Sequence, residues 1–242
     1  MEKRGQLTIF IIVALVVIGF VVLFFAFQNN LIQQPTNPNA DRVSNFVKDC
    51  IEQEGIKAVY QVGRNGGYFF APNKSTESGI AIYYELGKVY IPSKKQVEDE
   101  ISFLLGERVF FCTNYFENFL DINVTDAELS IKTDIQNEKV IFNVDYPITI
   151  AKGESKSTLK NFNVEIPIRA GIVYNSVAEF MRNQTAGNIC LSCLSDILTK
   201  NNIQVDMRDY DEDKVVFIFK DENSKINNET FAWIFANDYR LI

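Results

Sequence analysis

The chain has four cysteines, and three kinds of chemistry are open to them: zinc binding, thiol redox exchange and structural disulfides. Cys190-Leu-Ser-Cys193 is a CxxC pair, whereas Cys50 and Cys112 lie far apart, each in a stretch with helical periodicity. A tetrahedral zinc site usually needs two close pairs, and only one is present. A thioredoxin-like redox pair stands at the start of a helix that follows a strand, whereas this CxxC follows a predicted helix and a short loop.

Disulfides are therefore the chemistry that we expect of these cysteines. An even number of cysteines in a protein that works outside the cytoplasm favours pairing. We predict Cys50–Cys112 between two long helices and Cys190–Cys193 as a local bridge. Four cysteines allow three connectivities, so cross-pairing stays open.

The chain contains no histidine. This absence excludes Ser-His-Asp and Cys-His nucleophile pairs, HExxH zinc sites and histidine-ligated c-type haem. A glycosidase with two catalytic carboxylates stays open, because two acids cannot be selected among 31 Asp and Glu residues. We expect a protein that is not an enzyme, with no catalytic residue, no metal and no cofactor.

One acidic segment resembles the beginning of a calcium loop. Asp209-Tyr-Asp211-Glu-Asp213 alternates acidic residues, but Lys214 and Lys220 stand where an EF-hand loop needs glycine and glutamate. We interpret the segment as a hairpin turn.

Four sequons could accept N-linked glycans. Their asparagines are Asn73, Asn123, Asn183 and Asn228. All four fall in predicted loops or at the ends of predicted elements, where a glycan can sit. The chain is rich in asparagine, so these motifs give only weak support for a location outside the cell.

The apolar run Leu7–Phe27 sets the environment of the chain, because it contains no charged residue. As a helix it would be roughly 30 Å long, about the thickness of a bilayer's hydrocarbon core. It is longer than the apolar core of a cleaved signal peptide and is apolar on all sides, unlike a core helix. We predict a transmembrane helix in the lipid bilayer. Lys3 and Arg4 precede the run and no charge follows it before Asp41, so the N-terminus is expected in the cytoplasm and the rest outside.

The junction Lys3-Arg4-Gly5-Gln6 and the apolar run behind it resemble the class III signal peptide of archaeal type IV pilins and related surface proteins. The resemblance implies cleavage between Gly5 and Gln6, an apolar helix that stays on the mature protein, and packing of such helices in a filament core. Phe10 stands where bacterial pilins usually carry a glutamate, which archaeal members often lack. A plain signal anchor is the alternative.

A second resemblance covers more of the chain. The Lys-Arg-Gly-Gln start, Cys50, Gly66-Gly67-Tyr68 and Cys190-Leu-Ser-Cys193 are similar to a group of uncharacterised archaeal membrane-anchored proteins. This similarity implies an archaeal surface location and no particular activity.

The rest of the chain predicts an α+β domain over residues 41–242, with a sub-boundary near residue 123. Residues 1–6 form the cytoplasmic head, and Gln28–Ala40 is a predicted linker because Pro35 and Pro38 interrupt helices. Apolar residues at three- and four-residue spacing predict helices. The expected helices are Asp41–Gln61, a helix capped by Ser93 that reaches past Cys112, Gly171–Asn183 and Asn188–Lys200.

Strands are predicted where apolar residues alternate with polar ones, and the three long strands between residues 127 and 168 should form an antiparallel meander. The expected strands are Tyr68–Ala71, Ile80–Glu85, Lys88–Ile91, Ala127–Ile135, Lys139–Ile150, Leu159–Ile168, Ile203–Met207, Lys214–Lys220 and Phe231–Ala236.

The charge of the chain limits the classes of partner that it can bind. The formal net charge of −7 argues against a nucleic-acid surface, which needs a basic stripe. We expect a single-pass surface protein with a structural or interaction role, either as a pilin-like subunit that self-assembles or beside envelope proteins. A membrane-tethered ligand-binding module or enzyme is the alternative, and an accessory subunit of an envelope complex is a third.

Overall fold

The computed structural model describes residues 16–18, 38–185 and 189–240. The chain divides into two units, Met1–Asp41 and Arg42–Ile242. The expected head, the Gly5–Gln6 junction, most of the Leu7–Phe27 run and residues 28–37 of the expected linker lie outside the described residues. Among the residues that are described, no helix has the length and apolar character needed to cross a membrane.

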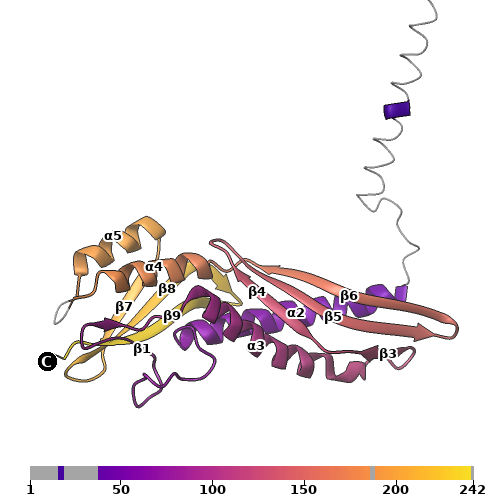
Figure 1. Cartoon of the computed structure of the whole chain (residues 1–242), viewed down its shortest axis with the longest axis horizontal. Helices are drawn as coiled ribbons and strands as arrows, with labels where there is room; N and C mark the ends of the chain where they lie inside the picture. The colour runs from indigo at the N-terminus through magenta and orange to yellow at the C-terminus, as the bar shows by residue number, and fades with distance from the viewer. Residues whose placement is uncertain (1–15, 19–37, 186–188, 241–242) are drawn as a thin grey trace, which may run out of the picture. The chain divides into compact units, whose positions relative to one another are not determined.

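The second unit has an α+β fold, as expected (Figure 1). Its helices are α2 (Pro38–Arg64, which begins just before the unit), α3 (Lys94–Thr113), the 3₁₀ turn η1 (Asn114–Phe116), α4 (Ala170–Arg182) and α5 (Leu191–Asn201). Its strands are β1 (Ile82–Glu85), β2 (Lys88–Val89), β3 (Asn123–Asp126), β4 (Ser130–Ile135), β5 (Val140–Lys152), β6 (Ser155–Ile166), β7 (Gln204–Asp209), β8 (Lys214–Ile226) and β9 (Glu229–Asp238).

One sheet contains five strands in the order β2-β1-β9-β8-β7. β1 and β9 run parallel, and every other pair in this sheet is antiparallel. The hairpin of β1 and β2 turns at Leu86 and Gly87, both of which have positive φ. A two-residue hairpin turn needs this conformation, so the sequence signal at Leu86-Gly87 is confirmed.

The second sheet is built around β5, which pairs with β6 from Val140 to Lys152 with a register shift between Asp145 and Ile148. The opposite edge of β5 is shared, because β4 pairs with Val140–Asp145 and β3 pairs with Ile148–Ala151. Pro147 lies between these two stretches, where its missing N–H interrupts no ladder. The expected meander of three long strands is confirmed, and β3 extends it.

Helix α2 packs against both sheets, and two of its glycines allow the close approach. A Cβ at Gly55 would collide with the ring of Phe142 in β5. A Cβ at Gly63 would lie 2.8 Å from the carbonyl oxygen of Ala232 in β9. Because one helix closes on both sheets, residues on either side of position 123 share one compact unit.

Helices α3 and α4 each cover one sheet. Helix α3 begins at the cap Ser93, whose Oγ accepts a hydrogen bond from the N–H of Gln96 at 3.2 Å, and it lies against β4. Helix α4 packs on the five-stranded sheet through Phe180, whose ring centroid is 5.0 Å from that of Phe217 in β8. Figure 1 shows α5 on the outer side of α4.

Three sequence-based expectations about these elements were wrong. Tyr68–Ala71 forms no strand; the N–H of Phe69 bonds instead to Oε2 of Glu100 in α3. Residues 38–40 of the expected linker belong to a helix, because Pro38 is the first residue of α2. Proline is tolerated there because the first N–H groups of a helix have no partner within the helix. Helix α5 starts at Leu191 rather than Asn188.

Candidate functional site

The disulfide Cys50–Cys112 joins α2 to α3, as predicted. Its Cα atoms are 5.9 Å apart, and the side chain of Cys50 is buried. The bond lies between two long helices that pack on different elements. It therefore works as a cross-link of the core.

The disulfide Cys190–Cys193 is the expected local bridge, with Cα atoms 5.3 Å apart. Cys190 is the N-cap of α5, and its Sγ accepts a hydrogen bond from the N–H of Cys193 at 3.3 Å. Both side chains are partly exposed. This bond thus lies at the molecular surface, at the first turn of a helix.

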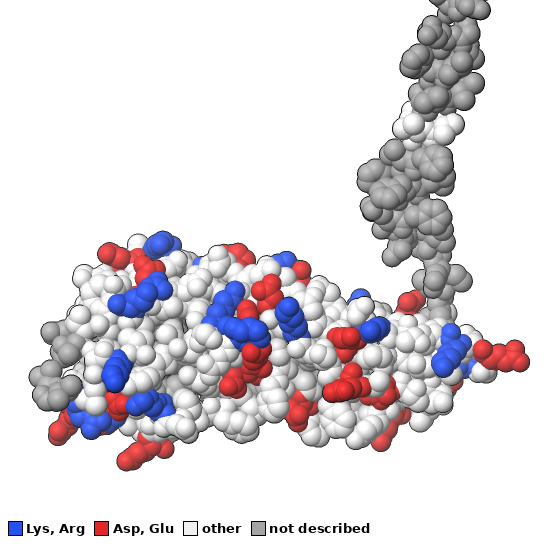
Figure 2. Space-filling model, viewed as in Figure 1, with Lys and Arg blue, Asp and Glu red and all other residues white. Residues whose placement is uncertain are grey.

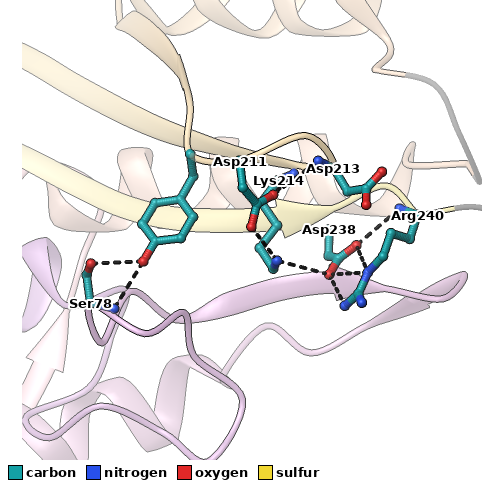
Figure 3. A network of polar contacts seen from close by, with 7 residues as sticks. Ser78, Asp211, Asp213, Lys214, Asp238 and Arg240 are labelled. Carbon is teal, nitrogen blue, oxygen red and sulfur yellow. Dashed lines mark hydrogen bonds and ion pairs between the residues drawn. The ribbon is translucent and has the colours of Figure 1, made fainter.

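The acidic segment before β8 is a hairpin turn, as interpreted from its sequence (Figure 3). The Oδ1 of Asp211 accepts hydrogen bonds from the N–H groups of Asp213 at 3.1 Å and Lys214 at 2.8 Å. The Lys214 ammonium also bonds to Asp211 and lowers the pKa of this carboxyl. Across the described residues, no group of three or more Cys, Asp or Glu side chains is arranged to hold a metal ion.

A buried carboxylate completes the network in Figure 3. Asp238 in β9 is 1% exposed, and the guanidinium of Arg240 bonds to it at 2.6 Å. Burial alone would raise the pKa of Asp238, but the hydrogen bonds from Arg240 hold it below the ordinary value. On the other side of the turn, the hydroxyl of Tyr210 bonds to the N–H and Oγ of Ser78. The Tyr210 contacts fasten the loop before β1 to the β7–β8 hairpin, and the pair of Lys214 with Asp238, 3.8 Å apart, fastens the end of β9 to it.

All four sequon asparagines are exposed. Asn73 lies in the loop before β1, Asn123 begins β3, Asn183 caps the end of α4, and Asn228 lies in the turn between β8 and β9. The expectation that they occupy loops and element ends is confirmed. Whether they carry glycans stays a prediction.

A groove beside α2 and α3 is lined by four phenylalanine rings among its eight residues, and we call it the α2–α3 groove. Its volume is about 480 Å³. Phe70 and Phe111 are each 72% exposed, and Phe103 is 57% exposed. The lining residues are Gln61, Phe69, Phe70, Phe103, Leu104, Glu107, Arg108 and Phe111.

The charged residues that line the α2–α3 groove are Glu107 and Arg108. The guanidinium of Arg108 bonds to Glu54 at 3.2 Å and to Gln61 at 2.7 Å, and elsewhere on α2 Lys57 pairs with Glu54 and Arg64 pairs with Glu229. The face in Figure 2 likewise carries acidic and basic side chains side by side, with no continuous basic stripe. The groove therefore offers apolar contact flanked by paired charges.

Sequence reasoning missed these surface rings. It assigned one apolar face to the helix after Ser93, yet Phe103, Phe110 and Phe111 lie on the outer side of α3 while Leu104, Leu105 and Val109 are buried. The signal was available, since the helix carries more large apolar residues than a single face can bury.

The chain cannot be placed by comparison with other proteins. No family model, no curated protein and no solved structure matches it. Its function must therefore be argued from its own residues.

Proposed function

We propose that this chain is a single-pass membrane-anchored protein of the archaeal cell surface, whose outer α+β domain makes non-catalytic contacts with other proteins. The observation that carries the contact role is the α2–α3 groove. Large apolar rings are unfavourable in water, and a contiguous exposed patch of them is typical of an interaction site. Phe70, Phe103 and Phe111 form such a patch.

Three observations support the location outside the cell. Disulfides persist in oxidising compartments, and all four cysteines are paired. The four sequon asparagines are exposed, so that glycosylation is sterically allowed. Lys3 and Arg4 ahead of the uncharged run favour a cytoplasmic N-terminus.

Substitution of the two most exposed groove rings tests the contact role. The full-length chain in membranes would be cross-linked with a lysine-reactive reagent, and the products compared between the wild type and Phe70→Ser/Phe111→Ser. We expect the yield of cross-linked product to be at least fivefold lower in the variant than in the wild type. Val89→Ser/Met207→Ser is the matched control, because it removes exposed apolar side chains elsewhere. Equal cross-linking in all three chains would contradict the proposal.

A pilin-like filament subunit is one form that this role could take, and the junction Lys3-Arg4-Gly5-Gln6 supports it. Small residues such as Gly19 would help the apolar helices to pack together. The intact mass of the mature chain should then correspond to a start at Gln6, and negative-stain microscopy of surface preparations should show filaments. A chain that keeps Met1 would refute processing.

A tethered ligand-binding module is the second candidate, and the size of the α2–α3 groove favours it. A volume of about 480 Å³ lies in the range of small-molecule sites. Native mass spectrometry of the full chain, purified in detergent, would reveal a retained small molecule. Its loss in Phe70→Ser/Phe111→Ser would support this function, and a ligand-free wild type would oppose it.

A further inference from the structure

The two disulfides lie in different surroundings, although Cys112 is partly exposed, as Cys190 and Cys193 are. Cys50–Cys112 links two helices, and Cys50 is buried. Cys190–Cys193 spans only three positions at the surface and joins no separate elements. A disulfide stabilises a fold mainly through the length of chain that it closes, so the second bond adds less to stability than the first. Its position at the surface suggests a role in thiol–disulfide exchange instead.

From this position we propose that Cys190–Cys193 is a redox-active disulfide, which accepts two electrons from a dithiol of a partner protein. This activity is separate from the contact role of the α2–α3 groove. Neither Cys190 nor Cys193 lines that groove or lies among the paired charges beside it. The proposal rests on the geometry of the first turn of α5.

The start of α5 favours the reduced form of Cys190. As the N-cap, this residue stands where free N–H groups and the helix dipole stabilise negative charge. The N–H of Cys193 already points at its sulfur, at 3.3 Å. These N–H groups stabilise a thiolate at Cys190, which makes it a better leaving group and makes the disulfide easier to reduce.

The bond is also accessible to a protein partner. Both cysteines are partly exposed, and Leu191 between them is 59% exposed. Helix α5 buries only two of its side chains, Leu194 and Ile197. Few core contacts would therefore have to change when the bond opens.

The exchange needs no co-reactant beyond the partner dithiol. A partner thiolate attacks Sγ of Cys193, forms a mixed disulfide and releases Cys190 as the stabilised thiolate. The second thiol of the partner loses its proton to solvent and attacks the sulfur of the first partner cysteine in the mixed disulfide. This attack releases Cys193 as a thiolate. The partner leaves as a disulfide with two electrons fewer, and the chain keeps the reduced pair.

Redox equilibration of the full chain in detergent tests the proposal. Samples held in glutathione buffers of graded potential would be alkylated, and the modified cysteines quantified by mass spectrometry. We expect Cys190–Cys193 to have an equilibrium constant for reduction roughly 100-fold more favourable than that of Cys50–Cys112. Equal constants, or a Cys190–Cys193 bond that is the harder to reduce, would overturn the proposal.

A second measurement follows electron transfer itself. One equivalent of a two-cysteine peptide is mixed with the oxidised chain, and formation of the peptide disulfide is measured. The wild type should oxidise close to one peptide per chain, whereas Cys190→Ser/Cys193→Ser should oxidise none. The variant keeps Cys50–Cys112, so an equal yield from both chains would assign the activity to that bond and refute the proposal.

Discussion

Arg169, which precedes α4, and Asp221 in β8 of the five-stranded sheet form a salt bridge. Nη1 of Arg169 lies 3.0 Å from Oδ1 of Asp221, which is completely buried, and Ser224 donates a further hydrogen bond to this carboxylate at 2.6 Å. The other arm of the guanidinium bonds to the carbonyl oxygen of Asn201 at 2.9 Å. One side chain before α4 thus holds both β8 and the end of α5.

Removal of this buried carboxylate should destabilise the fold strongly. We expect Asp221→Ala to lower the free energy of unfolding by about 3–5 kcal/mol, because a mostly buried guanidinium loses its buried carboxylate and keeps only the exposed one of Glu138, 3.6 Å away. Urea denaturation followed by circular dichroism measures the change. Lys95→Ala, which breaks the exposed pair with Asp99, should have no measurable effect. Similar losses in both variants would contradict this account.

The two disulfides should differ in their contribution to stability. Cys50 and Cys112 are 62 positions apart, so Cys50→Ala/Cys112→Ala should lose about 4 kcal/mol by the chain-entropy model. Cys190→Ala/Cys193→Ala should lose about 2 kcal/mol or less, since it closes a very short loop. Thermal unfolding of the two variants decides the order, and a larger loss in the second would be inconsistent with it.

Two helical glycines should respond in opposite directions to alanine. Gly63→Ala places a methyl group 2.8 Å from the Ala232 carbonyl, and we expect a net loss of about 1–3 kcal/mol from overpacking. Gly106→Ala in α3 meets no atom within 4 Å and should gain about 0.5–1 kcal/mol from helix propensity. A gain at Gly63, measured by urea denaturation, would show that α2 does not approach β9 closely.

The pKa of Asp238 predicts acid sensitivity. Because its pKa is lower in the folded chain than in the unfolded one, ionised Asp238 stabilises the fold above the unfolded pKa. This stabilisation should disappear as the pH falls from about 4 through the lower folded pKa. Asp238→Asn should be less stable than the wild type at neutral pH and should lose less on acidification. Parallel losses of unfolding free energy in the two chains would refute the assignment.

Much of the local structure could be predicted because it depends on neighbouring residues. Ser93 caps α3, Leu86-Gly87 turns a hairpin, and the long alternating strands form an antiparallel meander. Both disulfides were also predictable, since helix periodicity placed Cys50 and Cys112 on helices and CxxC spacing favours a local bridge. Apart from the pairing of Cys50 with Cys112, which are 62 positions apart, each of these features depends on residues that are close in the sequence.

The start of α5 and the conformation of Tyr68–Ala71 could not be predicted in the same way. The pattern placed Cys190 inside a helix that starts at Asn188, and the structure makes it the N-cap. Tyr68–Ala71 read as a strand, yet Glu100 of α3 takes the backbone hydrogen bond of Phe69. At Phe69 a contact from another element decided between local conformations of similar energy, whereas at Cys190 the cap hydrogen bond from Cys193 sets where the helix begins.

The sequence by itself determined the uncharged run Leu7–Phe27, the absence of histidine, and the type and order of most elements, because these follow from composition and short-range periodicity. Only the tertiary structure decided that β1 runs parallel to β9, that α2 closes on both sheets, and that Phe70, Phe103 and Phe111 meet in one groove. These relationships join segments far apart in the chain. Their energies come from packing between those segments, and no local pattern records which segments meet.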